Sequence, residues 1–407
     1  MSSMPPDIRY RLLSLALFFF WLLHALWQAI KSHQANYFWQ RLGLGPHRPE
    51  HAIWLHAASV GEVELIKPLV QSLKTNHSLV ITCFTPSGLR HAQRLYPDIV
   101  VRALPIDFWP ISRAFIKAHT FRLALIAETE LWPETLYQAH RSGVPLLQIN
   151  ARLSAKSLNT RGWARQTLQG TLAYFQRHLT RTAKDRDKLM AMGVDTDRIV
   201  IAGNLKYAGL HSELPAEPLI DRPYILFAST HAPEERLFAE LISKLGLSEL
   251  TVIAPRHPAR APAILQSLKA LHLPVAQRSR AEVIHADTRI YLADTLGELK
   301  ALMAHATLVI MGGSFNQTGG HNVLEPASLG KAILTGPSDD NIAADIALLS
   351  EQEAIIQVDN IDQLGNQISR LLQQPEVRHG MGQRARQVIE DQHHILETYL
   401  QQIESYL

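Results

Sequence analysis

The most informative stretch of this chain is Met311-Gly-Gly-Ser-Phe-Asn-Gln-Thr-Gly-Gly-His-Asn-Val-Leu-Glu-Pro326. An apolar, β-branched run at residues 307–310 precedes it, and residues 323–329 have the pattern of a helix. A strand, a glycine-rich loop and a helix start together present free backbone N–H groups to an anion. Glycine lets the main chain approach closely and adopt positive φ, and the helix dipole adds partial positive charge. We therefore predict a phosphate-binding loop here, with an ordinary tight turn as the alternative.

The same stretch supplies candidate residues for holding a nucleotide. Glu325, one turn into the predicted helix, can accept hydrogen bonds from ribose hydroxyls. The stretch thus predicts half of a sugar-nucleotide site. The other candidates within it are Gly312, Gly313, Ser314, Gly319, Gly320, His321, Asn322, Val323 and Leu324.

Size and composition place the chain among globular proteins. Its 407 residues leave room for two domains, and 46% hydrophobic with 19% charged residues is typical of folded chains. A net charge of +3, without a Lys/Arg block, does not predict a nucleic-acid partner, but it suits anionic substrates or an anionic membrane face. The single cysteine, Cys83, excludes an internal disulfide and favours a reducing compartment. No His or Cys spacing predicts a metal site.

The N-terminus differs from the rest of the chain. Residues 12–30 are almost continuously apolar and, at 1.5 Å per residue, are long enough to cross a bilayer core of roughly 30 Å. Trp21, Trp27 and the Tyr37-Phe38-Trp39 run suit a lipid–water interface. Cations on both sides fit a helix lying in one leaflet as well as a span. We predict a membrane anchor; a cleaved signal peptide is the alternative, although no clean Ala-x-Ala site follows.

From about residue 52 onward, predicted strands alternate with predicted helices, which favours parallel α/β sheets. Helical periodicity separates the strands, for example at 63–73, and the chain ends in a helical pattern at 377–406. The predicted strands lie at 52–57, 79–84, 123–127, 145–149 and 199–202 and, after a proline-rich stretch at 214–223, at 224–228, 250–254, 290–293 and 307–311.

We predict an α/β protein with two doubly wound, Rossmann-like domains, whose ligands lie in a cleft at the carboxyl ends of both sets of strands. The predicted limits are a membrane anchor at 1–33, a first domain at 34–207, a linker at 208–222, a second domain at 223–385, and a C-terminal helix at 386–407 that can pack back on the first domain.

Loops in the first half carry residue types suited to acid–base chemistry. Glu62 ends the run His56-Ala-Ala-Ser-Val-Gly-Glu62 at a predicted helix start, where the dipole favours the anion that a general base requires. From spacing alone, however, a capping box between Ser59 and Glu62 is favoured.

Two further loops add charge to the same edge. Glu128 and Glu130 can hold an acceptor or assist a base, or they can cap the helix that begins near Pro133. The segment Asn150-Ala-Arg-Leu-Ser154 brings a cation. Lys206 can place an ammonium where negative charge develops, with an ordinary exposed lysine as the preferred alternative.

In the second half, Ser229-Thr-His231 and Asp294-Thr-Leu-Gly-Glu298 each follow a predicted strand. In Pro255-Arg-His-Pro258, the fork of Arg256 suits a phosphate or a pyrimidine carbonyl. Each signal is weak alone, but their repetition at so many strand ends predicts one functional cleft.

This ordered set of motifs resembles the 3-deoxy-D-manno-oct-2-ulosonic acid (Kdo) transferases of Gram-negative lipid A synthesis. The resemblance covers nearly the whole chain. It rests on the apolar N-terminus, Ser-Val-Gly-Glu62, Glu-Thr-Glu-Leu-Trp-Pro133, Asn-Ala-Arg-Leu-Ser154, Gly-Asn-Leu-Lys206, Ser-Thr-His231, Pro-Arg-His-Pro258, Asp-Thr-Leu-Gly-Glu298 and Gly-Gly-His-Asn-Val-Leu-Glu325.

The resemblance implies a GT-B glycosyltransferase, with two Rossmann-like domains facing a cleft and an N-terminal anchor helix, at the cytoplasmic face of the inner membrane. It implies inverting, metal-independent transfer of Kdo from CMP-Kdo to a lipid A precursor (lipid IVA) in lipopolysaccharide core biosynthesis, without a cofactor. The implied partners are CMP-Kdo, the lipid A precursor and membrane lipids.

The family pattern also implies roles for residues. Glu62 becomes the catalytic base, and Glu128, Glu130 and Lys206 support the transition state. The second domain binds the donor through the glycine-rich stretch together with Ser229, Thr230, Pro255, Arg256, Leu296, Gly297, Glu298 and the segment from Asn322 to Glu325.

The chain departs from that pattern at three places. Glu134 replaces a usual asparagine, Tyr207-Ala208 replace an ending with aspartate, and Pro233 replaces a glycine. These changes bear on the acceptor side and leave the implied base and CMP residues in place. Two alternatives stay open: the same fold using a UDP- or GDP-sugar, and an inert membrane-bound scaffold.

Overall fold

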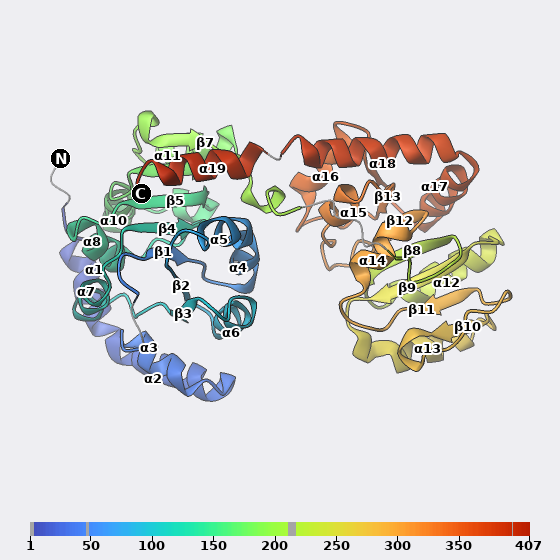
Figure 1. Ribbon diagram of the computed structural model, residues 1–407, viewed down its shortest axis with the longest axis horizontal. Helices are drawn as coiled ribbons and strands as arrows, with labels where there is room; N and C mark the ends of the chain where they lie inside the picture. Colours follow the sequence, from blue (N-terminus) through green and yellow to red (C-terminus); the bar gives the residue numbers. More distant parts are fainter. Residues whose placement is uncertain (1–3, 46–48, 211–216, 393) are drawn as a thin grey trace. The chain divides into compact units, whose positions relative to one another are not determined.

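The computed structural model describes residues 4–45, 49–210, 217–392 and 394–407. The chain divides into two compact units, one formed by Met1–Gly209 with His393–Leu407 and the other by Leu210–Gln392 (Figure 1). The domain limits given from the sequence stay predictions. The anchor segment and the C-terminal helix belong to the first unit, whereas residues 386–390 belong to a helix of the second.

The first unit is built on a parallel sheet, seven-stranded in its described part. Its strand order is β3-β2-β1-β4-β5-β6-β7. The strands are β1 (Ile53–His56), β2 (Leu79–Cys83), β3 (Val100–Ala103), β4 (Leu123–Ala127), β5 (Leu146–Ala151), β6 (Arg177–Thr180) and β7 (Ile199–Ile201). Ile53 pairs in register with both Leu79 and Leu123, so β1 lies between β2 and β4. Strands are added on one side of β1 up to β3 and on its other side from β4 onward, so the strand order reverses between β1 and β4. In such sheets, ligands bind outside the carboxyl ends at this switch point.

Helices surround this sheet in Figure 1. The α-helices are α1 (Ile8–Ala16), α2 (Phe18–Ser32), α3 (Ala35–Arg41), α4 (Val60–Leu65), α5 (Lys67–Leu73), α6 (Pro86–Leu95), α7 (Trp109–Ala118), α8 (Pro133–Arg141), α9 (Ala155–Leu158), α10 (Gly162–Leu172), α11 (Ala183–Ala191) and α19 (His394–Glu404). The 3-10 helices are η1 (Thr196–Arg198) and η2 (Leu205–Tyr207).

The second unit repeats the architecture with the order β10-β11-β9-β8-β12-β13-β14, again parallel throughout. Its strands are β8 (Tyr224–Thr230), β9 (Leu250–Pro255), β10 (Val275–Gln277), β11 (Ile290–Leu292), β12 (Leu308–Met311), β13 (Ile333–Thr335) and β14 (Ile356–Gln357). Its helices are α12 (Glu234–Leu245), η3 (Pro258–Arg260), α13 (Ala261–Lys269), η4 (Arg278–Arg280), α14 (Leu299–His305), α15 (Leu324–Ser328), α16 (Ala343–Ser350), α17 (Ile361–Gln373) and α18 (Pro375–Glu390). The predicted α/β class with two doubly wound sheets is confirmed.

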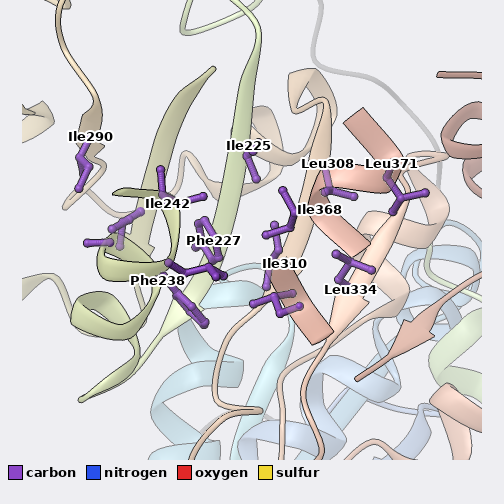
Figure 2. Close-up of a cluster of buried hydrophobic side chains, with 14 of the residues drawn as sticks. Ile225, Phe227, Phe238, Ile242, Ile290, Leu308, Ile310, Leu334, Ile368 and Leu371 are labelled. Atoms are coloured by element: carbon purple, nitrogen blue, oxygen red, sulfur yellow. The ribbon is translucent and has the colours of Figure 1, made fainter. Parts of the chain in front are cut away.

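Each sheet is fixed by its own apolar core. In the second unit, side chains from β8, β12 and β13 meet those of α12 and α17 (Figure 2). The rings of Phe227 and Phe238 stack there with centroids 4.3 Å apart. In the first unit, Trp54 of β1 packs against Phe115 and Phe121. These fully buried aromatics contribute a large share of core stability.

Several predicted helices are wrong in extent. The pattern at 63–73 forms two helices, α4 and α5, that meet at Ile66. The pattern at 377–406 is likewise divided, because α18 ends at Glu390 and α19 begins at His394. In the first unit, the Tyr399 hydroxyl of α19 donates to Gly203 O at 3.0 Å and accepts from Asn150 N at 3.2 Å. The helix predicted at 323–329 is the short α15.

The apolar N-terminal run is also divided. It forms α1 and α2, which meet at Leu17 with a 52° bend. Among the described residues, neither helix alone has the length and apolarity of a membrane span, and only the bent pair reaches them together. The anchor helix predicted from the sequence stays a prediction.

Candidate active site

Glu62 lies in the first turn of α4, shortly after the carboxyl end of β1. Its carboxylate accepts a hydrogen bond from the backbone N–H of Ala58. Ser59 is the N-cap residue, but its side chain makes no capping hydrogen bond within the described chain. The capping box favoured by the Ser59–Glu62 spacing is therefore wrong, and Glu62 instead holds the turn that follows β1.

The Glu62 carboxyl is poised for proton transfer. Burial and the negative charge of Glu130 raise the pKa of Glu62 to about 7, against the opposing effects of the Ala58 N–H and His56. The expectation that the helix start favours the Glu62 anion is thus wrong, because desolvation and like charge outweigh the dipole of this short helix. A carboxyl group with such a pKa is partly ionised at neutral pH and binds a proton more strongly than an ordinary glutamate, which suits a general base.

Glu130 is the neighbour that raises the Glu62 pKa, and it is held as an anion. Trp132 Nε1 donates to Glu130 Oε2 at 3.0 Å, and His56 Nε2 lies 3.4 Å from the same oxygen. Burial acts to raise the pKa of Glu130, but hydrogen bonds from His56 and Trp132 bring the pKa below its usual value. The contacts with His56 and Trp132 therefore favour the anion of Glu130.

His56 was absent from the candidate site residues. It is fully buried at the end of β1, and its Nδ1 lies 2.9 Å from the Thr82 hydroxyl, so the ring is fixed from both sides. Its signal in the sequence is its place at the end of a predicted strand, six residues before Glu62.

Glu128 lies at the end of β4 with φ of +53°, a conformation that non-glycine residues rarely adopt. Asn150 at the end of β5 has φ of +51° and donates its side-chain amide to Glu128 at 3.3 Å. Arg152 pairs with Glu128 at 2.5 Å, so the cation predicted from Asn-Ala-Arg reaches this edge. Strained residues at adjacent strand ends often mark functional sites.

The helix-capping alternative for Glu128 and Glu130 is wrong. Asp107 caps α8 instead, because its carboxylate accepts from the backbone N–H groups of Glu134 at 3.1 Å and Thr135 at 2.7 Å. The negative charges of Glu128 and Glu130 both act on Glu62 and raise its pKa.

Lys206 belongs to η2, which packs against α4, the helix of Glu62. The η2 start is held by Asn150, whose Oδ1 accepts from Leu205 N at 3.0 Å. The Lys206 ammonium lies 5.9 Å from the ring centroid of Tyr207. The first unit therefore brings the elements of all four predicted catalytic residues, Glu62, Glu128, Glu130 and Lys206, to one edge of its sheet.

In the second unit, the glycine-rich loop uses many of its donors internally. The Glu234 carboxylate is fully buried and accepts from the backbone N–H groups of Gly313 at 2.8 Å, Ser314 at 3.1 Å and Phe315 at 2.9 Å. It also accepts from His231 N at 2.8 Å. The prediction that the loop's first donors are free for a ligand anion is wrong, because an internal carboxylate already occupies them.

The glycines of the loop still have steric roles. A Cβ on Gly312 would lie 2.8 Å from the Thr230 backbone, and one on Gly320, with φ of +77°, would lie 2.5 Å from Ile342. The N–H groups of Gly319 and Gly320 donate to Ser338 Oγ and Gly313 O. Among the bonds within the described ranges, none uses the N–H groups of His321, Asn322 or Val323. Val323 is fully buried, so the donors open to a ligand are the N–H groups of His321 and Asn322, which precede α15.

Three imidazoles and an arginine gather beside this helix start. His321 Nε2 lies 2.8 Å from His231 Nε2, and His257 packs edge-on against His231 with ring centroids 5.4 Å apart. Burial, followed by the charges of His231, Arg256 and His257, lowers the pKa of His321 to about 4. Burial also lowers the pKa of His231. Burial thus favours the neutral form of His231 and of His321, close to the guanidinium of Arg256. The sequence did not predict His231 and His257 as site residues.

Two of the other donor-site candidates, Thr230 and Glu298, are bound to protein side chains. Thr230 donates its hydroxyl to Glu235 at 3.0 Å, and Ser229 has φ of +57°. Glu298 pairs with Arg278 at 2.7 Å, and the hydrogen bonds from Arg278 hold the pKa of Glu298 below its usual range.

Two further candidates lie beside the start of α15. Glu325 is on α15, and α14, which follows Leu296-Gly297-Glu298, packs against that helix. Burial raises the pKa of Glu325. Pro255 ends β9 just before Arg256.

No group of three or more His, Cys, Asp or Glu side chains is placed to hold a metal ion in the described part of the chain. Metal-independence stays a prediction.

A family model described as 3-deoxy-D-manno-octulosonic-acid transferase (kdotransferase) matches residues 36–209. The 3-deoxy-D-manno-octulosonic acid transferase of Bordetella pertussis is 33% identical over 314 residues, which are 71% of this chain and 72% of that protein. The chain belongs to this family. The transferase of the same description from Haemophilus influenzae is 29% identical over 88% of both chains.

A solved glycosyltransferase from Rickettsia africae has the same fold as this Kdo transferase. It covers 88% of this chain and 98% of its own with a TM-score of 0.59, at 13% identity. At that identity the likeness speaks for the fold alone. The predicted GT-B class is confirmed at the level of two parallel α/β sheets.

The three departures from the Kdo transferase pattern have structural accounts. Glu134 is 1% exposed and pairs with Arg11 of α1 through two hydrogen bonds of 2.9 and 3.0 Å. Tyr207 and Ala208 are buried. Pro233 is the N-cap residue of α12, immediately before Glu234. These three departures leave Glu62 and Arg256 unchanged.

Proposed function

We propose that this Kdo transferase moves Kdo from CMP-Kdo to a lipid A precursor, lipid IVA, with inversion at the anomeric carbon, in lipopolysaccharide core biosynthesis. The observation that carries the proposal is that a chain of the Kdo transferase family brings the elements of Glu62, Glu128, Glu130 and Lys206 to one edge of a sheet. Burial and the charge of Glu130 also raise the pKa of Glu62 to about 7. A group with this proton affinity at the end of the central strand suits removal of a proton from a sugar hydroxyl.

The reaction proceeds as a single displacement. The acceptor hydroxyl oxygen attacks the anomeric carbon of Kdo while Glu62 takes its proton, and the bond from that carbon to the CMP phosphate oxygen breaks. The electron pair leaves with CMP, so negative charge grows on its phosphate. One displacement from the face opposite the leaving group inverts the configuration.

The second unit supplies the donor site. The N–H groups of His321 and Asn322 and the guanidinium of Arg256 suit the phosphate, and the Glu325 carboxylate suits the ribose hydroxyls. Neutral His321 can donate or accept a hydrogen bond without adding charge. CMP carries one phosphate, so no metal is needed to hold a diphosphate.

Glu128, Glu130 and Lys206 support the base in this proposal. Glu130 sets the proton affinity of Glu62, Glu128 orients Arg152, and Lys206 offers positive charge to the developing negative charge. A location at the cytoplasmic face of the inner membrane fits an acceptor confined to the bilayer surface, and the apolar α1 and α2 supply a surface for it.

Mass spectrometry of the lipid formed from CMP-Kdo and lipid IVA tests the proposal. We expect a product heavier by whole Kdo residues, in a reaction that proceeds with a metal chelator present. A folded preparation that adds no sugar would favour the inert scaffold instead. Binding in which UDP or GDP outcompetes CMP would favour a pyrophosphate sugar donor.

A further inference from the structure

An apolar surface runs along the first unit over α1 and α2. Its exposed side chains include Ile8, 64% exposed, and Phe19, 75% exposed. Patches of this kind mark sites that other molecules cover. The remaining large apolar side chains of this surface are Leu12, Leu13, Leu15, Phe20, Leu23, Leu26, Trp27 and Ile30, with Trp39 of α3 and Trp109 of α7 nearby.

The opposite side of α2 is packed against protein. Ala25 and Ala29 are buried, and α2 contacts α3 and α6, as Figure 1 shows for α3. The end of α2 is fastened as well, because Arg90 donates to Ser32 O at 2.6 Å and Gln34 donates to Pro86 O at 3.1 Å. This helix therefore has one protein-facing side and one open apolar side along its length.

Polar contacts also dock α1 side-on. Tyr10 donates its hydroxyl to Asp107 at 2.5 Å, and Arg11 pairs with the buried Glu134. Burial, then the charge of Asp107, raises the pKa of Tyr10, so the phenol remains the donor. Moving α1 into the hydrocarbon core would leave the buried Glu134 carboxylate without Arg11 and would place the Arg11 guanidinium in lipid. Both changes are strongly unfavourable.

We propose that α1 and α2 lie in the plane of one leaflet, with their apolar side in the lipid, and do not cross the membrane. The inference rests on the membrane location proposed above, and it adds how α1 and α2 lie relative to the membrane. With α1 held by Asp107 and Glu134, only the 15 residues of α2 remain, and they rise about 22 Å against a hydrocarbon core of roughly 30 Å. The 52° bend at Leu17 lets both helices follow the surface of the unit.

The rim of this surface is basic, which fits the headgroups of anionic phospholipids. Arg113 of α7 and Arg141 of α8 are exposed and line a groove of about 420 Å³ beside Leu12 and Trp109. Lys31, at the end of α2, lies 4.7 Å from the Trp27 ring centroid. Apolar side chains flanked by cations and interfacial tryptophans are typical of helices that lie in a membrane interface.

Cysteine labelling tests the topology. Met4→Cys and Lys31→Cys place thiols at the two ends of the α1–α2 segment in the full chain, while the native Cys83 is buried. A membrane-impermeant maleimide is applied to inside-out and right-side-out membrane vesicles from cells that produce each variant. We expect both thiols to react only in inside-out vesicles, and the unsubstituted chain to give the background.

Each other outcome has a defined meaning. If Met4→Cys reacts from the face opposite Lys31→Cys, or from neither face, the in-plane topology is overturned. If both react only from the periplasmic face, the topology stands and the cytoplasmic location fails. If the unsubstituted chain is absent from the membrane fraction, the location and the topology fail together.

Vesicle flotation tests the basic rim. The full chain is mixed with vesicles of phosphatidylethanolamine and phosphatidylglycerol, or of phosphatidylcholine alone. Arg113→Glu with Arg141→Glu should weaken binding to the anionic vesicles by at least about ten-fold, since each basic residue near such a surface is attracted to it. The matched double variant Lys184→Glu with Arg186→Glu, on α11, makes the same change in charge and should bind like the unsubstituted chain. Equal losses in both double variants would overturn the assignment of this rim.

Discussion

Glu62 and Glu234 occupy matching places in the two units, yet their carboxylates have different surroundings. Each is in the first turn of the helix that follows the first strand of its sheet, α4 after β1 and α12 after β8. Glu62 accepts one backbone N–H and has Glu130 as a neighbour. Glu234 accepts four backbone N–H groups and is fully buried.

The difference shows that a glutamate in the first turn of a helix can have either a structural or a catalytic role. Glu234 satisfies the donors of the glycine-rich loop, so its charge is neutralised by dipoles and it shapes a binding surface. Glu62 is partly buried, with one backbone donor and another carboxylate beside it, so burial and then like charge raise its pKa. The partners around each carboxylate, rather than its position on the helix, therefore distinguish the two residues.

The largest effect is expected from Glu62→Gln. An amide cannot accept the hydroxyl proton, so the rate of Kdo transfer should fall by about 10²- to 10⁴-fold. The assay is single-turnover mass spectrometry of the lipid product. Stability, measured by urea unfolding, should change little because the amide keeps an oxygen for the Ala58 N–H.

Glu64→Gln is the matched control for that variant, since Glu64 is an exposed residue of the same helix, paired with His91. It should retain nearly full activity. Full activity in the Glu62 variant would remove this residue from the chemistry.

The second effect is on stability. Glu234→Gln replaces one carboxylate oxygen with an N–H₂ group that faces two backbone donors, so unfolding free energy should fall by about 3 kcal/mol. Urea denaturation measures the loss. The control Glu240→Gln on the same helix, where Glu240 is partly exposed and paired with Arg236, should cost less than about 0.5 kcal/mol. A loss as small in the Glu234 variant would mean that the four donors have other partners.

A third, smaller effect concerns pH. Glu62 is a base only when deprotonated, so kcat/KM should fall as pH decreases through about 7. Glu130→Gln removes a negative charge that disfavours the Glu62 anion, so the fall should move to lower pH. His56→Asn removes a group that lowers the Glu62 pKa, so the fall should move to higher pH. Shifts of both variants in the same direction would reject this coupling.

The smallest effect is expected from Thr230→Val. The Thr230 hydroxyl donates to Glu235, which also binds Arg260, so its loss should cost about 1 kcal/mol of stability. CMP affinity, measured by calorimetry, should stay within about two-fold. A ten-fold weaker affinity would show that the hydroxyl contacts the ligand.

Most of the fold was predictable from apolar runs bounded by turn residues. The strand at 123–127 matches β4, and most other predicted strands differ from the structure by only one or two residues at each end. Five strands of the described chain were missed, namely β3, β6, β10, β13 and β14. The strand β3 contains the buried Arg102, whose guanidinium donates to Gly43 O and Leu44 O. A charged residue breaks the apolar pattern of a strand, and its distant partners are invisible to local periodicity.

The site was predictable as a set of loops, but not as a set of partners. The resemblance to the Kdo transferases selected Glu62, Glu130 and Arg256. The contact of His56 with Glu130, however, spans 74 residues, and that of Glu234 with Gly313 spans 79. Tertiary packing decides such pairs, so the sequence could offer donors and acceptors without showing which of them meet.

The most direct test of the central claim is the pH dependence of the single-turnover rate of Kdo transfer in the unsubstituted chain. With Glu62 as a base whose pKa is about 7, the rate should rise with pH and reach half its maximum near that value. A rate that stays constant down to pH values near 5 would contradict the account, because a base of that proton affinity would then be largely protonated and inactive.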